Sequence, residues 1–261
     1  MPRGPNSHDD PEAFFERLDV VDAPRELIAL GGRLDVPTLV AAYRAGCFPW
    51  PSTGPYQALL EEEASELARE GEVPVLPHTD PAVVAMPWTC PDPRPVLFPE
   101  TVVISRSLRH RLRRCGWETT MDAAFNEVLA GCADRDGTWI SPAMQQAYAK
   151  LHRAGVAHSL EVWADRRLVG GLYGVLTGRV FAGESMFHRV SDASKVAVVD
   201  LCHRLVQAGV VVIDTEQESE HMEHLGQIPL SREQYVGLVR RLRDQHVELA
   251  TDRRPVAHLV P

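Results

Sequence analysis

Apolar residues recur at helical spacing in the N-terminal part of the chain. Between Leu34 and Tyr43 this spacing predicts a helix that has Pro37 in its first turn and ends at Gly46. The residues before this region, 1–18, are interpreted as a polar tail. We therefore expect the folded part of the chain to begin after residue 18.

The periodicity is lost between residue 51 and about residue 87, where the chain is acidic and then rich in proline. This part is interpreted as a surface insertion or linker that holds a short helix over Ala58 to Arg69. It belongs to a smaller N-terminal domain, which is predicted over residues 19–100.

Beyond residue 100 the pattern predicts helices and short strands in a layered order. The predicted elements are a strand at 101–104, helices that open after Ser105, at Thr120 and Asp122, and at Ser141, strands at 157–164, 167–178 and 179–182, a helix at 192–208, a strand at 210–215, and a helix capped by Ser231 and Gln234. This order predicts an α+β fold, layered as in α/β proteins, with a mixed sheet. It is similar to the order in GNAT-like acetyltransferases, so residues 101–261 are predicted to form a GNAT-like catalytic domain.

The centre of this domain is predicted at residues 179–195. There a strand leads to the long helix through a turn that carries Gly183, Glu184, Ser185 and Met186. Functional groups of α/β proteins gather where strands end. The turn is therefore a candidate location for a site.

Composition is that of an ordinary globular protein, with 44% hydrophobic and 24% charged residues. No apolar run reaches the roughly 18 residues that a membrane span needs, and the N-terminus lacks an apolar signal core, so we expect a cytoplasmic protein with no membrane partner. The five cysteines are spread along the chain without a C-x-x-C pair, which favours reduced and mostly buried thiols.

The formal net charge of -9 argues against a nucleic-acid partner only if the charge is spread evenly. The first hundred residues hold 17 Asp and Glu against 7 Lys and Arg, whereas residues 101–200 hold 13 Lys and Arg against 10 Asp and Glu. A local basic site for phosphates is therefore compatible with the overall charge. The candidate for this phosphate site is the helix after Ser105, and the alternative is that this helix is an ordinary solvated one. Its arginines are Arg106, Arg109, Arg111, Arg113 and Arg114.

Two further sets of side chains could carry chemistry. Trp139 stands directly before a helix cap, where its ring could stack on a base, although a single tryptophan is more often a core residue. Glu184, Asp214 and Glu216 form a carboxylate set, in which Asp214 ends an apolar strand and Glu216 shares its face if the strand continues. Such a set suits a proton acceptor or a cation pocket, and a carboxylate that only caps a turn is the alternative.

Metal and cofactor chemistry has little support in the sequence. The close pair His221 and His224 lies in a glutamate-rich stretch without a cysteine, so no metal site is predicted. An enzyme of GNAT-like fold that uses coenzyme A should hold pyrophosphate on a glycine-bearing loop before the long helix, and the loop at 187–195 has no glycine. We therefore expect no cofactor.

A series of longer motifs follows in order along the chain. They are YRAGCFPW at 43–50, WTCPDPR at 88–94, ISRSLR at 104–109, GTWIS at 137–141, AYAKLHRAGVAHSLEVW at 147–163, LVGGLYGV at 168–175, FAGESMF at 181–187, ASK at 193–195 and VID at 212–214. Together these segments resemble the leucyl/phenylalanyl-tRNA–protein transferase family, over a stretch from about Gly31 to Val239 that only the acidic insertion interrupts.

The resemblance implies a peptidyl transfer that needs neither ribosome nor ATP. Such enzymes move leucine or phenylalanine from its tRNA to a protein that begins with arginine or lysine, which marks that protein for degradation. The implied partners are Leu-tRNA, Phe-tRNA and proteins or peptides with N-terminal Arg or Lys. An aminoacyl ester is already activated, and an α-amino group with a pKa of about 7.7–8.0 is partly neutral at physiological pH, so the enzyme must mainly align the two and manage one proton.

The resemblance also implies roles for individual residues. Trp139 and Trp88 would hold the terminal adenosine, and the five arginines would contact phosphates. Glu184, Asp214 and Glu216 would form the catalytic set, with Asp214 orienting the amine and receiving its proton. The leucyl or phenylalanyl side chain would enter an apolar pocket lined by Leu172, Phe181, Met186 and Ile213.

One position departs from the family pattern, which commonly has glutamine where this chain has Glu216, with Gln217 one place further on. The departure affects two expectations. One is a proton relay that uses an amide at this position, and the other is which acceptor the enzyme prefers. Two other classes stay open: a GNAT-like acyltransferase that uses coenzyme A, and a non-catalytic module that binds tRNA or a peptide.

Overall fold

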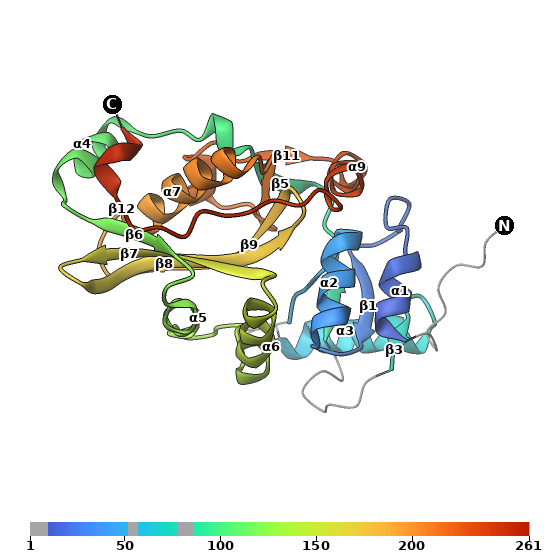
Figure 1. The fold of residues 1–261 in the computed structure, drawn as a ribbon. Helices are drawn as coiled ribbons and strands as arrows, with labels where there is room; N and C mark the ends of the chain where they lie inside the picture. The colour runs from blue at the N-terminus through green and yellow to red at the C-terminus, as the bar shows by residue number, and fades with distance from the viewer. Residues whose placement is uncertain (1–9, 52–56, 78–85, 261) are drawn as a thin grey trace. The chain divides into compact units, whose positions relative to one another are not determined.

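The computed structural model describes residues 10–51, 57–77 and 86–260. The chain divides into two compact units, whose elements are labelled in Figure 1. The first comprises residues 1–94, 135–150 and 230–241, and the second comprises residues 95–134, 151–229 and 242–261. The first block of the first unit ends near the boundary predicted at residue 100, but this unit also takes in two later segments. The division into independent domains stays a prediction.

The first unit is built on a four-stranded sheet of order β2-β4-β1-β3. Strand β1 runs parallel to β3 and antiparallel to β4, which also pairs with β2. The strands are β1 (Leu27–Gly31), β2 (Phe48–Pro49), β3 (Val75–Leu76) and β4 (Pro87–Thr89). The helices are α1 (Pro11–Arg17), α2 (Val36–Ala45) and α3 (Gln57–Arg69), with most of α6 (Pro142–Arg153) and of α9 (Arg232–Leu242).

The end of α2 and the start of α9 are as the sequence predicts. The side chain of Asp35 accepts a hydrogen bond from Thr38 N (3.0 Å) at the start of α2, and Gly46 ends that helix in the left-handed conformation, which favours glycine. At the start of α9, Ser231 N donates to Gln234 Oε1 and Gln234 N donates to Ser231 Oγ. This is the reciprocal capping box that the Ser231 and Gln234 spacing predicts.

Two expectations about this unit are wrong. Within the polar tail, residues 10–18 are described and include helix α1, whose Phe14 and Phe15 are buried, because the helix places its two aromatic rings against the core. Within the insertion, helix α3 is confirmed, but the chain after it is not a linker: Val73 and Leu76 are buried and β3 joins the sheet. Residues 1–9, 52–56 and 78–85 of these predicted segments lie outside the described residues.

The second unit is built on an eight-stranded mixed sheet of order β11-β5-β10-β9-β8-β7-β6-β12. Strand β10 pairs antiparallel with β5 and parallel with β9, and from β9 through β8, β7 and β6 to β12 each strand pairs antiparallel with the next. The strands are β5 (Arg94–Leu97), β6 (Glu118–Met121), β7 (Ala157–Ala164), β8 (Arg167–Thr177), β9 (Val180–His188), β10 (Val212–Asp214), β11 (Ile228–Leu230) and β12 (Arg254–Pro255). The three consecutive strands predicted from the sequence are therefore confirmed as β7, β8 and β9.

Helices cover both faces of this sheet (Figure 1). Helix α7 (Ala193–Ala208) lies on one face, where Ala193 packs so closely on Gly170 that a Cβ at Gly170 would come within 2.6 Å of it. Helix α5 (Phe125–Ala133) lies on the other face, where Gly131 leaves room for the ring of Phe187. The remaining helices of the unit are α4 (Arg106–Arg114) and α8 (Glu220–Glu223), with 3-10 turns at η2 (Pro99–Thr101) and η3 (Val256–Leu259).

Two predicted elements of this unit are misplaced. The strand expected at 101–104 is instead β5, because the apolar run that pairs with β10 lies earlier, at Pro95 to Leu97. The helix expected to open at Thr120 and Asp122 begins only at Phe125, since Thr120 belongs to β6. Asp122 has a φ of 60° and binds the next strand, with its Oδ1 accepting from Ser159 N at 2.9 Å. A side chain used across strands is not available to cap the helix.

Candidate active site

A bulge in strand β9 places Glu184 in the second unit. Along β8 and β9, Tyr173 pairs with Ser185 and Gly174 pairs with Gly183, so Glu184 is the extra residue between them. The bulge depends on Gly174, because a Cβ there would lie 2.1 Å from the carbonyl oxygen of Ala182 and 2.4 Å from the ring of Phe181. Glu184 itself is buried. The segment 183–186, expected to be a turn, is thus a bulged strand.

Strand β10 ends on Asp214, beside the same part of β9. Asp214 pairs with Ala182, so the bulge at Glu184 lies two residues further along the neighbouring strand. The Asp214 side chain has no exposed surface, and its Oδ1 accepts a hydrogen bond from Glu216 N at 3.0 Å. The end of β10 and the bulge of β9 therefore bring two buried carboxylates into one region of the sheet.

Glu216 follows in a turn rather than on an extended strand. Its φ is 61°, in the left-handed region, and its side chain is buried, whereas the side chain of Gln217 is exposed. The strand-alternation argument for placing Glu216 with Asp214 fails, since β10 stops at Asp214. The turn nevertheless keeps the Glu216 residue next to Asp214, because the backbone N–H of Glu216 donates to Asp214 Oδ1.

A buried amide that the sequence did not single out fixes this turn. Gln227 donates from Nε2 to Thr215 Oγ1 and to the carbonyl oxygen of Gln217 (2.8 Å), and its Oε1 accepts from Ser219 N (3.2 Å). All three partners belong to the loop that follows Asp214. One side chain thereby holds the loop that carries Glu216, and the separation of about a dozen positions gave no sequence signal for it.

The four apolar residues predicted to line a substrate pocket lie in one hydrophobic cluster of the second unit. Leu172 faces Met186 across β8 and β9, and Phe181 faces Ile213 across β9 and β10. Three of the four are buried, and Met186 is the more open one. The structure thus brings them together within a core that also includes α7, and their contact with a substrate stays a prediction.

The two tryptophans predicted to bind adenosine lie in the first unit and differ in their surroundings. Trp88 has no exposed surface, donates from Nε1 to the carbonyl oxygen of Gly31 (2.8 Å) and packs on Phe15. A ring with no open face cannot stack on a base, so this structure assigns Trp88 to the core. Trp139 is 7% exposed and lies 5.7 Å from Trp50, centroid to centroid. The half-buried Trp50 is the more open ring of this pair.

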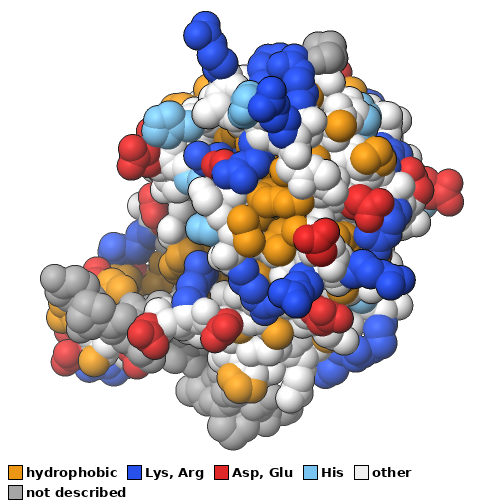
Figure 2. Space-filling view, turned by 90° about the vertical axis from the view of Figure 1, so that its left-hand side faces the viewer, with side chains coloured by type: hydrophobic (Ala, Val, Ile, Leu, Met, Phe, Trp, Pro, Cys, Tyr) orange, Lys and Arg blue, Asp and Glu red, His pale blue; other side chains and the backbone are white. Residues whose placement is uncertain are grey.

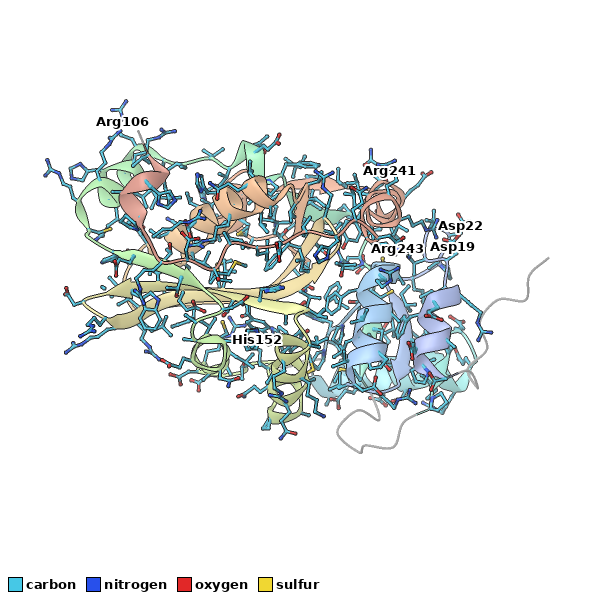
Figure 3. All side chains as sticks on the ribbon, in the orientation of Figure 1. Asp19, Asp22, Arg106, His152, Arg241 and Arg243 are labelled. Atoms are coloured by element: carbon cyan, nitrogen blue, oxygen red, sulfur yellow. The ribbon has the colours of Figure 1, made fainter. Side chains whose placement is uncertain are left out.

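The predicted basic helix is α4. Its apolar side is formed by Leu108 and Leu112, which are buried, and Ser105 caps it by accepting from Leu108 N. Arg111 forms an ion pair with Asp192, with Nε 3.3 Å from Oδ2, and its guanidinium lies over the ring of Trp117. The exposed arginines are Arg106, Arg109, Arg113 and Arg114. Figure 2 views the end of the molecule that carries α4 and shows Lys and Arg side chains gathered there, and Figure 3 shows Arg106 projecting outward.

The fold and the site define an α+β protein with a mixed sheet, an acidic site at a strand end and an exposed basic helix. Comparison with known proteins makes the assignment specific. The model of the family "Leucyl/phenylalanyl-tRNA protein transferase" matches residues 96–240, and that of its N-terminal domain matches residues 32–60. This chain belongs to the leucyl/phenylalanyl-tRNA–protein transferase family.

Individual relatives agree with the family model. A leucyl/phenylalanyl-tRNA–protein transferase of Pseudomonas aeruginosa (strain LESB58) is 43% identical over 236 residues, which cover 88% of this chain and 92% of that protein. One of Stutzerimonas stutzeri (strain A1501) is 45% identical over 207 residues, covering 78% and 79%. The predicted family and enzyme class are therefore confirmed.

Solved structures are similar only at a low level. A GCN5-related N-acetyltransferase from Kribbella flavida shares 12% identity at a TM-score of 0.36, covering 54% of this chain and 55% of that one. A conserved protein from Bacteroides thetaiotaomicron shares 12% identity at a TM-score of 0.40, covering 75% and 74%. TM-scores this low do not establish a shared fold. The predicted fold class therefore rests on the mixed sheet and on the separate N-terminal family region.

The helices of the described residues include none with the length and apolar character that a membrane crossing requires.

Proposed function

We propose that this chain transfers leucine or phenylalanine from its tRNA to proteins that begin with arginine or lysine. The observation that carries the proposal is the group of three buried carboxylates, Glu184, Asp214 and Glu216, at the end of β10 and the bulge of β9. A positively charged acceptor is the substrate that such a group attracts most strongly. Family membership supports the aminoacyl donor.

The reaction replaces an ester bond by an amide bond and moves one proton from nitrogen to oxygen. The neutral α-amine of the acceptor attacks the carbonyl carbon of the aminoacyl ester, a C–N bond forms, and the C–O bond to the tRNA ribose breaks. The tRNA leaves with a hydroxyl group, and the amine gives up a proton. Asp214 orients the amine, receives that proton and passes it to the ribose oxygen that leaves, because its carboxylate is buried and its Oδ1 is already held by Glu216 N.

The other residues bind the two substrates. Glu184 and Glu216 attract the cationic acceptor, and the extra negative charge of Glu216, where the family commonly has glutamine, strengthens the preference for arginine and lysine. The aminoacyl side chain enters among Leu172, Phe181, Met186 and Ile213, where the flexible methionine adapts to leucine or phenylalanine.

Aminoacyl-tRNA binding is assigned to aromatic and basic side chains. Trp139, with Trp50 beside it, is assigned to the terminal adenosine by stacking. The exposed arginines of α4 are assigned to the tRNA phosphates, where charge and not base identity governs binding. We propose the cytoplasm as the location, since tRNA is there and all five cysteines of the chain are free thiols.

A coenzyme A donor is the less favoured alternative. In such an enzyme the pyrophosphate sits at the N-terminus of the helix that corresponds to α7. Here that position holds the carboxylate of Asp192, which lies 3.3 Å from Arg111 and 3.9 Å from Lys195. A carboxylate at this position competes with a pyrophosphate for the positive end of the helix dipole.

The test is transfer of labelled leucine from Leu-tRNA to a peptide that begins with arginine, without ATP or ribosomes. A peptide of the same sequence that begins with alanine is the control for the acceptor rule, and acetyl-CoA in place of Leu-tRNA is the control for the donor. We expect label on the arginine peptide alone. Equal labelling of the two peptides would contradict the acceptor rule, and acetylation without leucyl transfer would contradict the donor.

A further inference from the structure

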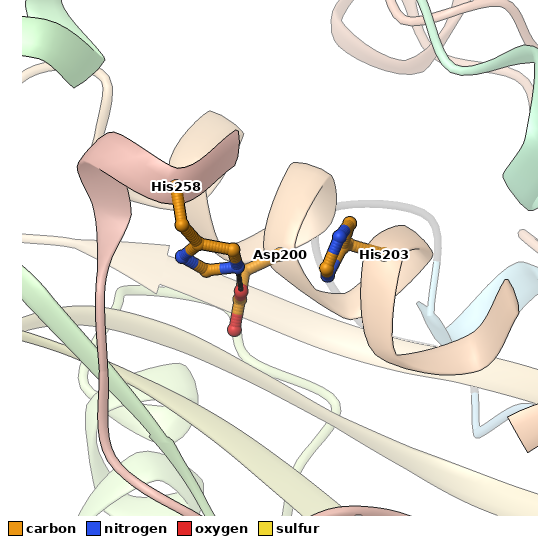
Figure 4. A group of neighbouring side chains, drawn as sticks. All are labelled: Asp200, His203 and His258. Atoms are coloured by element: carbon orange, nitrogen blue, oxygen red, sulfur yellow. Dashed lines mark ion pairs between the residues drawn. The ribbon is translucent and has the colours of Figure 1, made fainter. Parts of the chain in front are cut away.

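A second group of polar side chains lies on the α7 face of the second unit, away from the carboxylates described above. Asp200 and His203 lie three residues apart on α7, so they share one face of the helix, and His258 approaches from η3 near the C-terminus (Figure 4). One ligand atom from each of the three residues lies within 4.8 Å of the others. This is a convergence of two imidazoles and a carboxylate.

The carboxylate is positioned by its surroundings. Asp200 has no exposed surface, and its Oδ2 accepts a hydrogen bond from Arg204 Nε at 2.7 Å. The guanidinium of Arg204 also donates to the carbonyl oxygens of Ala250 and Asp252, so it is itself fixed. The other oxygen, Oδ1, is buried, makes no hydrogen bond to any described residue and lies 3.5 Å from His258 Nε2. A buried oxygen without a hydrogen bond leaves a position that a bound ion or a water can fill.

The two histidines are oriented for ligation. His258 donates from Nδ1 to the carbonyl oxygen of Pro255 (2.6 Å), a bond that leaves the lone pair of the neutral ring on Nε2, the atom nearest Asp200. The ring of His203 lies 4.9 Å from that of His258, and its Nδ1 is buried without a hydrogen bond among the described residues. Arg204 and Pro255 thus act as the outer partners that orient metal ligands in known sites.

The distances suit a tetrahedral ion. With bonds of about 2.0–2.1 Å, neighbouring ligand atoms around zinc lie about 3.3 Å apart. The separation of 3.5 Å between Asp200 Oδ1 and His258 Nε2 is close to this value, and the ligand atom of His203 lies within 4.8 Å of both. The His258 side chain is 26% exposed, which leaves a fourth position open to water.

We propose that Asp200, His203 and His258 bind a zinc ion that fastens the C-terminal segment to helix α7. The ion links η3 to the centre of the helix, next to the points where Arg204 binds the carbonyl oxygens of Ala250 and Asp252. Its role is structural, and it does not depend on the transfer reaction. Three ligands with one exposed position bind zinc reversibly, so the ion is removable by a chelator.

The test uses the full-length chain without a histidine tag, treated with EDTA and dialysed, and titrated with Zn²⁺ by calorimetry. We expect one saturable site per chain with a Kd in the micromolar range or below, and a rise in Tm when Zn²⁺ is present in excess. His203→Gln and His258→Gln are each expected to weaken binding about tenfold or more. His246→Gln, at an exposed histidine outside the group, is the matched control and should bind as the wild type does.

A spectrum with Co²⁺ identifies the ligands. Tetrahedral d–d bands without thiolate-to-cobalt charge transfer are expected for a site of two nitrogens and one oxygen. The proposal is overturned if the folded wild-type chain has no saturable site, if His203→Gln and His258→Gln bind Zn²⁺ as tightly as His246→Gln, or if the Co²⁺ complex shows thiolate bands.

Discussion

Gln227 provides a direct way to separate the geometry of the acidic site from its charge. The substitution Gln227→Ala removes the three hydrogen bonds that its amide makes to Thr215 Oγ1, Gln217 O and Ser219 N, and it leaves every carboxylate in place. The loop after Asp214 then loses the side chain that holds it. We predict that transfer falls while the net charge of the site is unchanged.

The expected size of the effect of Gln227→Ala follows from the three hydrogen bonds that are lost. Each neutral hydrogen bond contributes about 1 kcal/mol, so the loop loses about 2–4 kcal/mol of local stabilisation. Part of this appears as a lower free energy of unfolding. The rest appears as displacement of Glu216, and misplacement of a reacting group by about 1 Å costs about 10²-fold in rate.

The assay is single-turnover transfer of leucine to an arginine peptide at saturating Leu-tRNA, with urea unfolding measured on the same preparations. Gln146→Ala, at an exposed amide on α6, is the matched control and should leave both quantities unchanged. If Gln227→Ala were folded and transferred leucine as fast as Gln146→Ala, the loop would not position the reacting groups, and the reasoning would be refuted.

Three further predictions concern the strand bulge, a buried glutamate and the basic helix. Gly174→Ala should abolish transfer and lower the free energy of unfolding by several kcal/mol, because the new Cβ would lie 2.1 Å from a carbonyl oxygen; unfolding at wild-type urea concentrations would contradict this. Burial raises the pKa of Glu161, so the folded chain keeps that proton at a pH where the unfolded chain, with a pKa of about 4.3, has lost it. The free energy of unfolding should therefore fall as pH rises through the window above about 4.3, and Glu161→Gln should flatten that slope in urea titrations; an unchanged slope would count against it. Arg106→Gln should weaken tRNA binding and reduce its log–log salt slope by about one, measured by filter binding, whereas an unaltered slope would exclude a phosphate contact.

Local signals in the sequence predicted most of the elements. The cap of helix α2, Asp35, and its glycine stop, Gly46, are eleven positions apart, and β7, β8 and β9 follow one another through short turns. In such cases the interactions that decide the structure are close in sequence, so the pattern contains them. The capping box of α9 is the clearest example.

Features set by distant contacts were not predictable. The bulge at Glu184 arises from the register of β9 against β8, and Gly174, which makes room for it, lies ten positions away. The substrate role of Trp88 is implied by the family resemblance alone, and no local feature of the sequence shows that Gly31 and Phe15 enclose its ring. The proposed ligands Asp200 and His258 are far apart in the chain, and only the fold brings them together.

The measurement that tests the account most directly is the transfer rate of Asp214→Asn. Asparagine keeps the acceptor for Glu216 N but cannot receive a proton, so the fold should survive while the chemical step fails. We predict a rate lower by about 10²–10⁴-fold with unchanged affinity for Leu-tRNA. Asp165→Asn, at an exposed turn position of positive φ that asparagine also tolerates, is the control. If Asp214→Asn transferred leucine at the rate of Asp165→Asn, Asp214 would not be the proton acceptor.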